Sequence, residues 1–198
     1  MTDHYYSKNP SAASDKRTLD AVLRGKAFSF VTDAGVFSKD GVDFGSRLLI
    51  ETMEIAEDDA VLDVGCGYGP IGLSAAALAT RGKVTMIDIN ERAVELAREN
   101  ARRNGLANVE VLQGDLFEPV QGQTFTKILT NPPIRAGKQV VHQIFEQARE
   151  HLTEGGQLWV VIQKKQGAPS ALAKLETLFP SVREADKNKG YRIYCAEK

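Results

Sequence analysis

The sequence has little cysteine, no long apolar run and no excess of charge of either sign. Its 198 residues include only two cysteines, Cys66 and Cys195. Two thiols are too few for a disulfide framework or a metal cluster, so we expect both to be reduced and buried, and we expect no metal site. No stretch approaches the roughly 20 apolar residues that span a bilayer, and the N-terminal residues lack a signal-peptide pattern. We therefore expect a cytoplasmic protein without membrane partners.

The balance of charged residues restricts the class of partner. Lys and Arg number 25 and Asp and Glu number 26, and the formal net charge of −1 argues against a uniformly basic nucleic-acid-binding protein. Hydrophobic residues make up 42% of the chain and charged residues 26%, as in ordinary soluble globular proteins. The length fits one domain overall, which we divide into an N-terminal extension, residues 1–59, packed on a core, residues 60–198.

The core sequence alternates strand-like and helix-like runs. Short segments rich in Val, Ile and Leu predict strands, and segments with apolar residues at helical spacing predict crossover helices. The expected strands are 60–65, 83–89, 108–114, 125–131, 156–163, 180–187 and 191–198, and the expected helices are 70–82, 90–105, 139–153 and 168–178. This order predicts an α/β fold with a doubly wound, mostly parallel, seven-stranded sheet.

The N-terminal extension follows a different pattern. Residues 26–38 alternate polar and apolar side chains around a glycine-containing turn, which predicts a hairpin. Residues 43–56 predict a helix capped by Asp43, and the polar stretch from Lys8 to Lys16 predicts a flexible arm. We expect this part of the chain to cover the open edge of the main fold.

Three glycines follow the first core strand in the segment LDVGCGYGP. A glycine turn at the carboxyl end of a parallel strand lets a ligand lie against the backbone and the N-terminus of the following helix. Gly65, Gly67 and Gly69 occupy that place. Asp88 ends the next strand, 23 residues after Gly65, where an acid commonly holds ribose hydroxyls, and Asp115 ends the third strand, within reach of an adenine amine. The spacing predicts a nucleoside site, with simple tight turns as the alternative.

The same motif distinguishes a dinucleotide from a cationic nucleoside ligand. Its Gly-x-Gly-x-Gly spacing, followed by Pro70, lacks the third glycine of the dinucleotide-binding Gly-x-Gly-x-x-Gly pattern. Asp63 opens the motif with a negative charge, which suits the ammonium of an amino acid better than a pyrophosphate. Ribose, adenine and an amino group together describe S-adenosylmethionine, which we expect as the cofactor.

The fourth core strand ends in Asn131, Pro132 and Pro133, and the two prolines fix the backbone there. An exocyclic base amine is a weak nucleophile because its lone pair is delocalised into the ring. If the Asn131 side-chain oxygen and the Pro132 carbonyl accept its two hydrogens, the lone pair can point at the methyl donor. Catalysis then rests on placement, without a strong general base. The histidines, which are His4, His142 and His151, are accordingly expected to be solvated or structural.

These motifs resemble those of a known family. The combination of DVGCGYG, DIN, GD and NPP looks like a class I S-adenosylmethionine-dependent methyltransferase. HYYS near the start, GVFS at 35–38, GS at 45–46 and NPPIRAGK are similar to the methyltransferase small domain family, whose members include ribosomal small-subunit RNA guanine-N2 methyltransferases. The resemblance covers nearly the whole chain, in a single-domain form, and implies an N-methyltransferase that uses S-adenosylmethionine.

The resemblance also implies roles for individual residues. Asp63, Gly65 and Gly67 would contact the methionine end of the cofactor, Asp88 the ribose, and Asp115 with Leu116 the adenine. Phe37 and the Gly45–Ser46 region would close over the pocket, and Asn131 to Pro133 would hold the target amine. The expected cofactor-binding residues are Phe37, Asp63, Gly65, Gly67, Gly69, Asp88, Ile89, Asp115 and Leu116.

One position departs from the related enzymes. The residue after Asn-Pro-Pro is often aromatic there and stacks on a flipped base, whereas here it is Ile134, which offers only an apolar face. Base stacking is therefore weakened or supplied elsewhere.

Cations gather in the loops that the topology places beside the proposed pocket. With Ile134, the expected substrate-binding residues are Arg135, Lys138, Lys164, Lys165, Lys187 and Lys189. Such a rim suits RNA phosphates and predicts ribosomal RNA or the small ribosomal subunit as the partner. A protein glutamine N5-methyltransferase acting on a translation factor, a cofactor-binding module without turnover and a nicotinamide-dependent enzyme remain alternatives.

Overall fold

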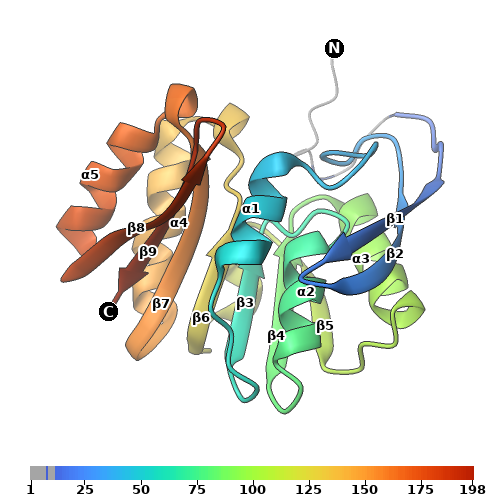
Figure 1. The fold of residues 1–198 in the computed structure, drawn as a ribbon, viewed down its shortest axis with the longest axis horizontal. Helices are drawn as coiled ribbons and strands as arrows, with labels where there is room; N and C mark the ends of the chain where they lie inside the picture. Colours follow the sequence, from blue (N-terminus) through green and yellow to red (C-terminus); the bar gives the residue numbers. More distant parts are fainter. Residues whose placement is uncertain (1–7, 9–11) are drawn as a thin grey trace.

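The computed structural model describes Lys8 and residues 12–198, so His4 and the HYYS motif lie outside the described residues. Strands and helices follow one another along the chain (Figure 1). In order they are β1 (Arg17–Leu23), β2 (Lys26–Thr32), α1 (Phe44–Thr52), β3 (Ala60–Val64), α2 (Pro70–Leu78), β4 (Lys83–Asp88), α3 (Glu91–Arg103), β5 (Val109–Gln113), η1 (Glu118–Val120), β6 (Phe125–Thr130), η2 (Ile134–Ala136), α4 (Lys138–His151), β7 (Leu152–Gln163), η3 (Lys164–Gln166), α5 (Ala168–Leu178), β8 (Ser181–Asn188) and β9 (Tyr191–Glu197).

The main sheet contains seven strands in the order β5-β4-β3-β6-β7-β9-β8. The five strands from β5 to β7 are parallel, whereas β9 is antiparallel to both of its neighbours, β7 and β8. The strand order reverses direction next to β3, where ligands bind in doubly wound sheets. The predicted seven-stranded, mostly parallel sheet is therefore confirmed.

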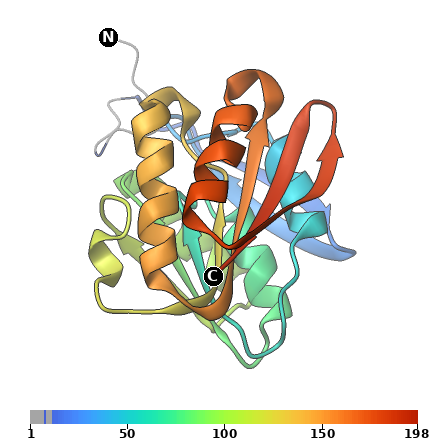
Figure 2. The same ribbon diagram turned by 90° about the vertical axis from the view of Figure 1, so that its left-hand side faces the viewer.

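Alternating side chains of the central strands build a core on each face of this sheet. On β3, Val61 belongs to the core that lies under α1, α2 and α3, whereas Leu62 belongs to the core that lies under α4 and α5. Figure 2 shows α4 and α5 side by side on their face of the sheet. Burial on both faces explains why β3, β6 and β7 contain nearly continuous apolar runs in the sequence.

The N-terminal hairpin differs from its prediction. Its two strands are β1 and β2, and the chain turns at Arg24 and Gly25, which have φ values of 48° and 74°, rather than at Gly35. The hairpin and α1 also lie over one face of the main sheet and not at its edge (Figure 1). Asn100 of α3 explains the position of β2, because its side chain accepts from the Val31 N–H at 2.7 Å and donates to the Val31 carbonyl at 3.0 Å. The outer backbone groups of β2 are thus paired by a helix side chain.

Helix starts follow the predicted caps more closely than helix ends do. The Asp43 carboxylate accepts from the Ser46 N–H, and the Asn90 side chain accepts from the Ala93 N–H, as expected of N-caps. By contrast, α1 ends at Thr52 and α2 at Leu78, four residues before their predicted ends.

No helix in the described part of the chain is long and apolar enough to cross a membrane.

Candidate active site

A cavity of about 490 Å³ lies at the carboxyl ends of β3, β4 and β6. Parallel strands bring these ends to one edge of the sheet, where the loops that follow them meet. The cavity brings together most of the predicted site residues, namely Phe37, Gly65, Gly67, Asp88, Ile89, Asp115, Leu116, Asn131, Pro132, Pro133, Ile134 and Arg135. The predicted residues that do not line it are Asp63, Gly69, Lys138, Lys164, Lys165, Lys187 and Lys189.

The glycine loop presents its backbone to this cavity. Gly65 and Gly67 have φ values of 75° and 57°, which side chains rarely adopt, and a Cβ atom built on either would meet no protein atom within 4 Å. The N–H groups of Gly65 and Cys66 both donate to the Ile87 carbonyl at 2.9 Å, which ties the loop to the end of β4. The open space beside a fixed backbone fits a ligand that lies directly against the loop.

Asp88 joins the glycine loop to the start of α3. Its Oδ2 accepts from the Gly67 N–H at 2.8 Å and its Oδ1 accepts from the Asn90 N–H at 2.9 Å. Burial raises the pKa of this carboxyl, and the backbone N–H donors oppose that rise. Asp88 also lines the cavity, and a carboxylate has about four acceptor positions, so it has acceptor capacity for the hydroxyls of a ribose besides these backbone donors.

Asp63 lies beneath the loop and not in the cavity wall. Its side chain is 0% exposed, and Oδ2 accepts from the Gly72 N–H at 2.8 Å. Oδ1 is buried without a hydrogen-bond partner among the described residues. Burial, reinforced by the charge of Asp88, raises the pKa of Asp63 to about 7. Direct contact between Asp63 and a ligand ammonium therefore stays a prediction.

Gly69 is also set back from the cavity. It is the N-cap residue of α2 and packs against Leu73 and Met86. It shapes the start of the helix and does not contribute to the cavity surface.

The two residues that the sequence predicts beside the adenine lie in the loop after β5. Asp115 is exposed and Leu116 half-buried, and both line the cavity. Leu116 has a φ of 48°, a left-handed conformation that is costly for a branched side chain. Strained residues of this kind gather at ligand sites, where the surrounding structure holds them in place.

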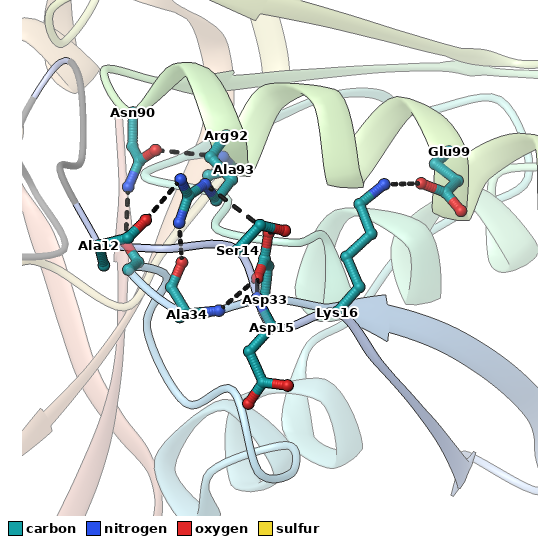
Figure 3. A network of polar contacts seen from close by, with 11 residues as sticks. Ala12, Ser14, Asp15, Lys16, Asp33, Ala34, Asn90, Arg92, Ala93 and Glu99 are labelled. Carbon is teal, nitrogen blue, oxygen red and sulfur yellow. Dashed lines mark hydrogen bonds and ion pairs between the residues drawn. The ribbon is translucent and has the colours of Figure 1, made fainter.

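A loop from the N-terminal extension forms one wall of the cavity. Side chains at the start of α3 hold this loop through polar contacts (Figure 3). Asn90 Nδ2 donates to the Gly35 carbonyl at 2.9 Å, and the Arg92 guanidinium donates to the carbonyls of Ala34 and Ala12. Arg92 also lies 3.7 Å from the Asp33 carboxylate. These contacts position the next residues of the loop, including Phe37, which is 40% exposed and lines the cavity.

Asp33 is the buried centre of this network. Burial by itself raises its pKa, but hydrogen bonds from Ser14, Asp15 and Ala34 and the charge of Arg92 together hold the pKa below its usual value. Ser14 and Asp15 bond to Asp33, so this part of the N-terminal segment is tied down and the expectation of a flexible arm is wrong there. No pattern in the sequence indicated this network, because its partners are far apart along the chain.

Asn131 is oriented by two residues from the start of α1. Its Nδ2 lies 3.0 Å from Ser46 Oγ and 3.4 Å from Asp43 Oδ2. An ionised carboxylate only accepts hydrogen bonds, so the NH₂ side of the amide must face Asp43. The carbonyl oxygen of Asn131 is therefore the acceptor that remains on the opposite side. Sequence reasoning identified Asp43 only as a helix cap and missed this second contact.

The predicted cations occupy different surroundings. Of these cations only Arg135 lines the cavity, while Lys138 starts α4 and Lys164 and Lys165 are the first two residues of η3. The backbone N–H of Lys164 donates to the Gly190 carbonyl at 2.7 Å, which brings the loop after β7 beside the turn between β8 and β9. The loop after β7 carries Lys164 and Lys165 and the turn carries Lys189, while Lys187 lies near the end of β8, so four of the six predicted cations gather in this region.

Two of these lysines already have partners. Lys187 Nζ lies 3.4 Å from a carboxylate oxygen of Glu184, and Lys189 Nζ lies 4.8 Å from the ring centroid of Phe44. An exposed ion pair such as that of Lys187 with Glu184 contributes little to stability.

The remaining chemically active side chains have surroundings that do not favour catalysis. Cys66 borders the cavity, but burial, with the charges of Asp88 and Asp63, raises the pKa of its thiol, which disfavours a nucleophilic thiolate. His151 is buried with Nδ1 2.8 Å from the Gln147 carbonyl oxygen, and neither it nor His142 lines the cavity. Among the described residues, no group of three His, Cys, Asp or Glu side chains could hold a metal ion.

The fold and this arrangement of loops define a class of protein. A glycine loop after β3, an acid at the end of β4 and Asn-Pro-Pro after β6 share one cavity in a Rossmann-like seven-stranded sheet. This is the architecture of the class I methyltransferases. The sequence model of the methyltransferase small domain family matches residues 27–195, and the chain belongs to this family.

Known proteins resemble the chain to different extents. YbxB of Bacillus subtilis, described as uncharacterized, is 59% identical over 200 residues, and the alignment covers 100% of this chain and 100% of YbxB. Ribosomal RNA small subunit methyltransferase C of Klebsiella pneumoniae is 34% identical over 162 residues, which are 80% of this chain and 47% of that protein. The Thermus thermophilus 16S rRNA N2 G1207 methyltransferase RsmC, solved with AdoMet and guanosine, is 27% identical with a TM-score of 0.82 over 96% of this chain and 52% of that one. The chain thus spans about half the length of these two rRNA methyltransferases.

Proposed function

We propose that this protein transfers a methyl group from S-adenosylmethionine to an exocyclic amine of an RNA base, with guanine N2 of small-subunit ribosomal RNA as the target. The observation that carries the proposal is the fixed amide of Asn131. Its NH₂ faces Asp43 and Ser46, so its oxygen is the group offered to a substrate amine. The glycine loop and Asp88 border the same cavity and supply the neighbouring nucleoside site.

The cofactor, when bound, supplies a methyl group already activated by a sulfonium, and the protein needs only to place the acceptor. Asp88 would accept from the ribose hydroxyls, while the loop at Gly65 and Gly67 would lie against the methionine end. Asp115 and Leu116 would border the adenine, and Ile89 would pack beside it. All of these residues line the cavity directly.

The acceptor amine would be held by two oxygens. Asn131 Oδ1 is one, and the Pro132 carbonyl is the other, because the Pro133 carbonyl already accepts from the Ala136 N–H at 2.9 Å. With both N–H bonds held, the nitrogen lone pair points away from the base plane and toward the donor. Placement of this kind can supply much of a rate enhancement without a general base.

The relatives support the choice of target. Both rRNA methyltransferases named above share the methyltransferase fold or sequence with this chain over most of its length. The Thermus protein is described with a guanosine, whose exocyclic amine is the group that the Asn131 oxygen would hold. Cations at Arg135 and in the loops after β7 and β8 would contact RNA phosphates.

Labelled S-adenosylmethionine tests the proposal directly. The protein is incubated with deproteinised 16S ribosomal RNA, with assembled small subunits and with translation factors as separate substrates. Label in N2-methylguanosine of either RNA sample supports the proposal, after digestion and separation of the nucleosides. Label confined to protein would instead favour glutamine methylation, and tight binding of NAD in place of S-adenosylmethionine would favour a nicotinamide enzyme.

A further inference from the structure

Tyr191 occupies a place in the cavity that the sequence did not indicate. It begins β9 and lines the cavity together with Asn131 and Ile134. Its ring lies against the backbone of α1, because a Cβ atom built on Gly45 would stand 2.7 Å from Tyr191 Cε1 and 3.0 Å from Cδ1. Any larger residue at position 45 would push the ring away, so glycine there permits this contact.

The contact places Tyr191 beside the acceptor group. Gly45 is followed by Ser46, and Ser46 Oγ lies 3.0 Å from Asn131 Nδ2. The Tyr191 ring thus packs on α1 at Gly45, the residue before Ser46. Ser46 is the side chain that orients the Asn131 amide, whose oxygen we propose to bind the substrate amine. Tyr191 is half-buried, packs against Gly45 through Cε1 and Cδ1, and is one of the residues that line the cavity.

Neighbouring residues hold the ring in position. The Tyr191 and Phe44 rings have centroids 5.6 Å apart and planes inclined by 49°, and Lys189 Nζ lies over the Phe44 ring. The pairing of Tyr191 with Gln163 in the sheet and the bond between Lys164 N–H and the Gly190 carbonyl fix the backbone on either side. A rigid aromatic side chain in a cavity wall is the usual surface on which an unstacked nucleobase lies.

We propose that Tyr191 is the residue on which the target base stacks, and that it supplies the aromatic contact that Ile134 cannot. The inference rests on the proposed function, since it takes a nucleobase as the occupant. A base lying on Tyr191 has its edge within reach of the Asn131 amide, because the same short stretch of α1 positions both side chains. Tyr191 acts as a positioning residue and takes no part in proton or methyl transfer.

The test uses 2-aminopurine riboside, a fluorescent base that carries the same exocyclic amine as guanine. Its fluorescence is titrated with the protein loaded with S-adenosylhomocysteine, for the wild type, Tyr191→Phe and Tyr191→Leu. We expect the wild type and Tyr191→Phe to quench the probe with similar affinity, and Tyr191→Leu to bind it roughly fivefold or more weakly with little quenching. Cofactor affinity from calorimetry and the melting temperature should match in all three proteins, which excludes a folding defect.

Methyl transfer to RNA provides the second readout. Tyr191→Leu should raise KM for RNA by roughly fivefold or more, and Tyr191→Phe should restore it. No quenching by the wild type, or equal quenching and equal KM in Tyr191→Leu, overturns the stacking role while leaving methylation of RNA intact as a proposal. Quenching that depends on Tyr191 in a protein that methylates no RNA supports the stacking role and counts against the proposed function instead.

Discussion

Replacement of Asp63 by Asn should remove a pH dependence from the stability of the ligand-free protein. The Asp63 carboxyl is completely buried, and only one of its oxygens has a partner among the described residues, the Gly72 N–H. Burial raises its pKa from 3.8 to about 7. The folded protein therefore keeps Asp63 protonated at pH values where the unfolded chain has already ionised it.

The sign and size of the effect follow from this difference. The folded state binds more protons than the unfolded state between about pH 4 and about pH 7, so the free energy of unfolding falls as pH rises through this window. Each pH unit corresponds to about 1.4 kcal/mol, which gives a loss on the order of 4 kcal/mol across the window. The stabilising contribution is complete below about pH 4, and no further loss from this group occurs above about pH 7.

The Asp63→Asn protein behaves differently because an amide does not titrate. The substitution keeps an oxygen for the Gly72 N–H but places an NH₂ group at the unpartnered position, at a pH-independent cost of about 1–3 kcal/mol. Urea unfolding of both proteins is measured from about pH 4 to about pH 8. The free energy of unfolding of the variant should rise relative to that of the wild type as the pH increases to about 7. Asp115→Asn, at an exposed position, serves as the control and should parallel the wild type. A difference between Asp63→Asn and wild type that stays constant with pH would refute the reasoning.

Three further predictions concern the ligand sites. Asp88→Ala should weaken S-adenosylhomocysteine binding about tenfold or more in calorimetry, since it removes charge-assisted acceptors and the support of the glycine loop, and unchanged affinity would contradict the ribose role. Arg92→Ala should lower the affinity for S-adenosylhomocysteine several-fold, because it frees the loop that carries Phe37. The amide hydrogens of this loop should then exchange faster. Exchange as slow as in the wild type would show that Arg92 does not hold the loop. Replacing Lys187 and Lys189 with Glu should weaken RNA binding and reduce its salt slope by about 1–2, and an unchanged slope would exclude these lysines as phosphate contacts.

The core of the fold was predictable because its signals are local. Runs such as 60–64 and 156–163 are apolar because they are buried on both faces, and Asp43 and Asn90 cap helices through bonds within four residues. The first hairpin strand, Arg17–Leu23, was missed although Leu19, Ala21 and Leu23 face the core in alternation. Val22 between them is apolar but 60% exposed, so the sequence does not show the alternation that the burial pattern has. Gly35, a stronger turn signal than Arg24–Gly25, belongs instead to the loop that Asn90 holds.

The loops of the site were predictable from the sequence, whereas the long-range contacts that position its side chains were not. Glycines and acids at strand ends indicate a ligand cavity, because parallel topology brings those ends together. The bond from Asn131 to Ser46 joins residues 85 positions apart, and Tyr191 reaches the cavity only through the packing of β9 against α1. No spacing in the sequence encodes such pairs, since they depend on how separate elements pack.

The most direct test of the proposed chemistry is the single-turnover rate of methyl transfer to RNA in Asn131→Ala, measured beside its affinity for S-adenosylmethionine. We expect the rate to fall by about 10²–10³, as when one oriented polar group is removed from a reacting centre, while cofactor affinity stays within about threefold. Ser46→Ala, which loosens the amide without removing it, should lose only about two- to tenfold in rate. An Asn131→Ala protein that methylates RNA as fast as the wild type, or that loses cofactor affinity in step with its rate, would contradict the role of this amide in holding the substrate amine.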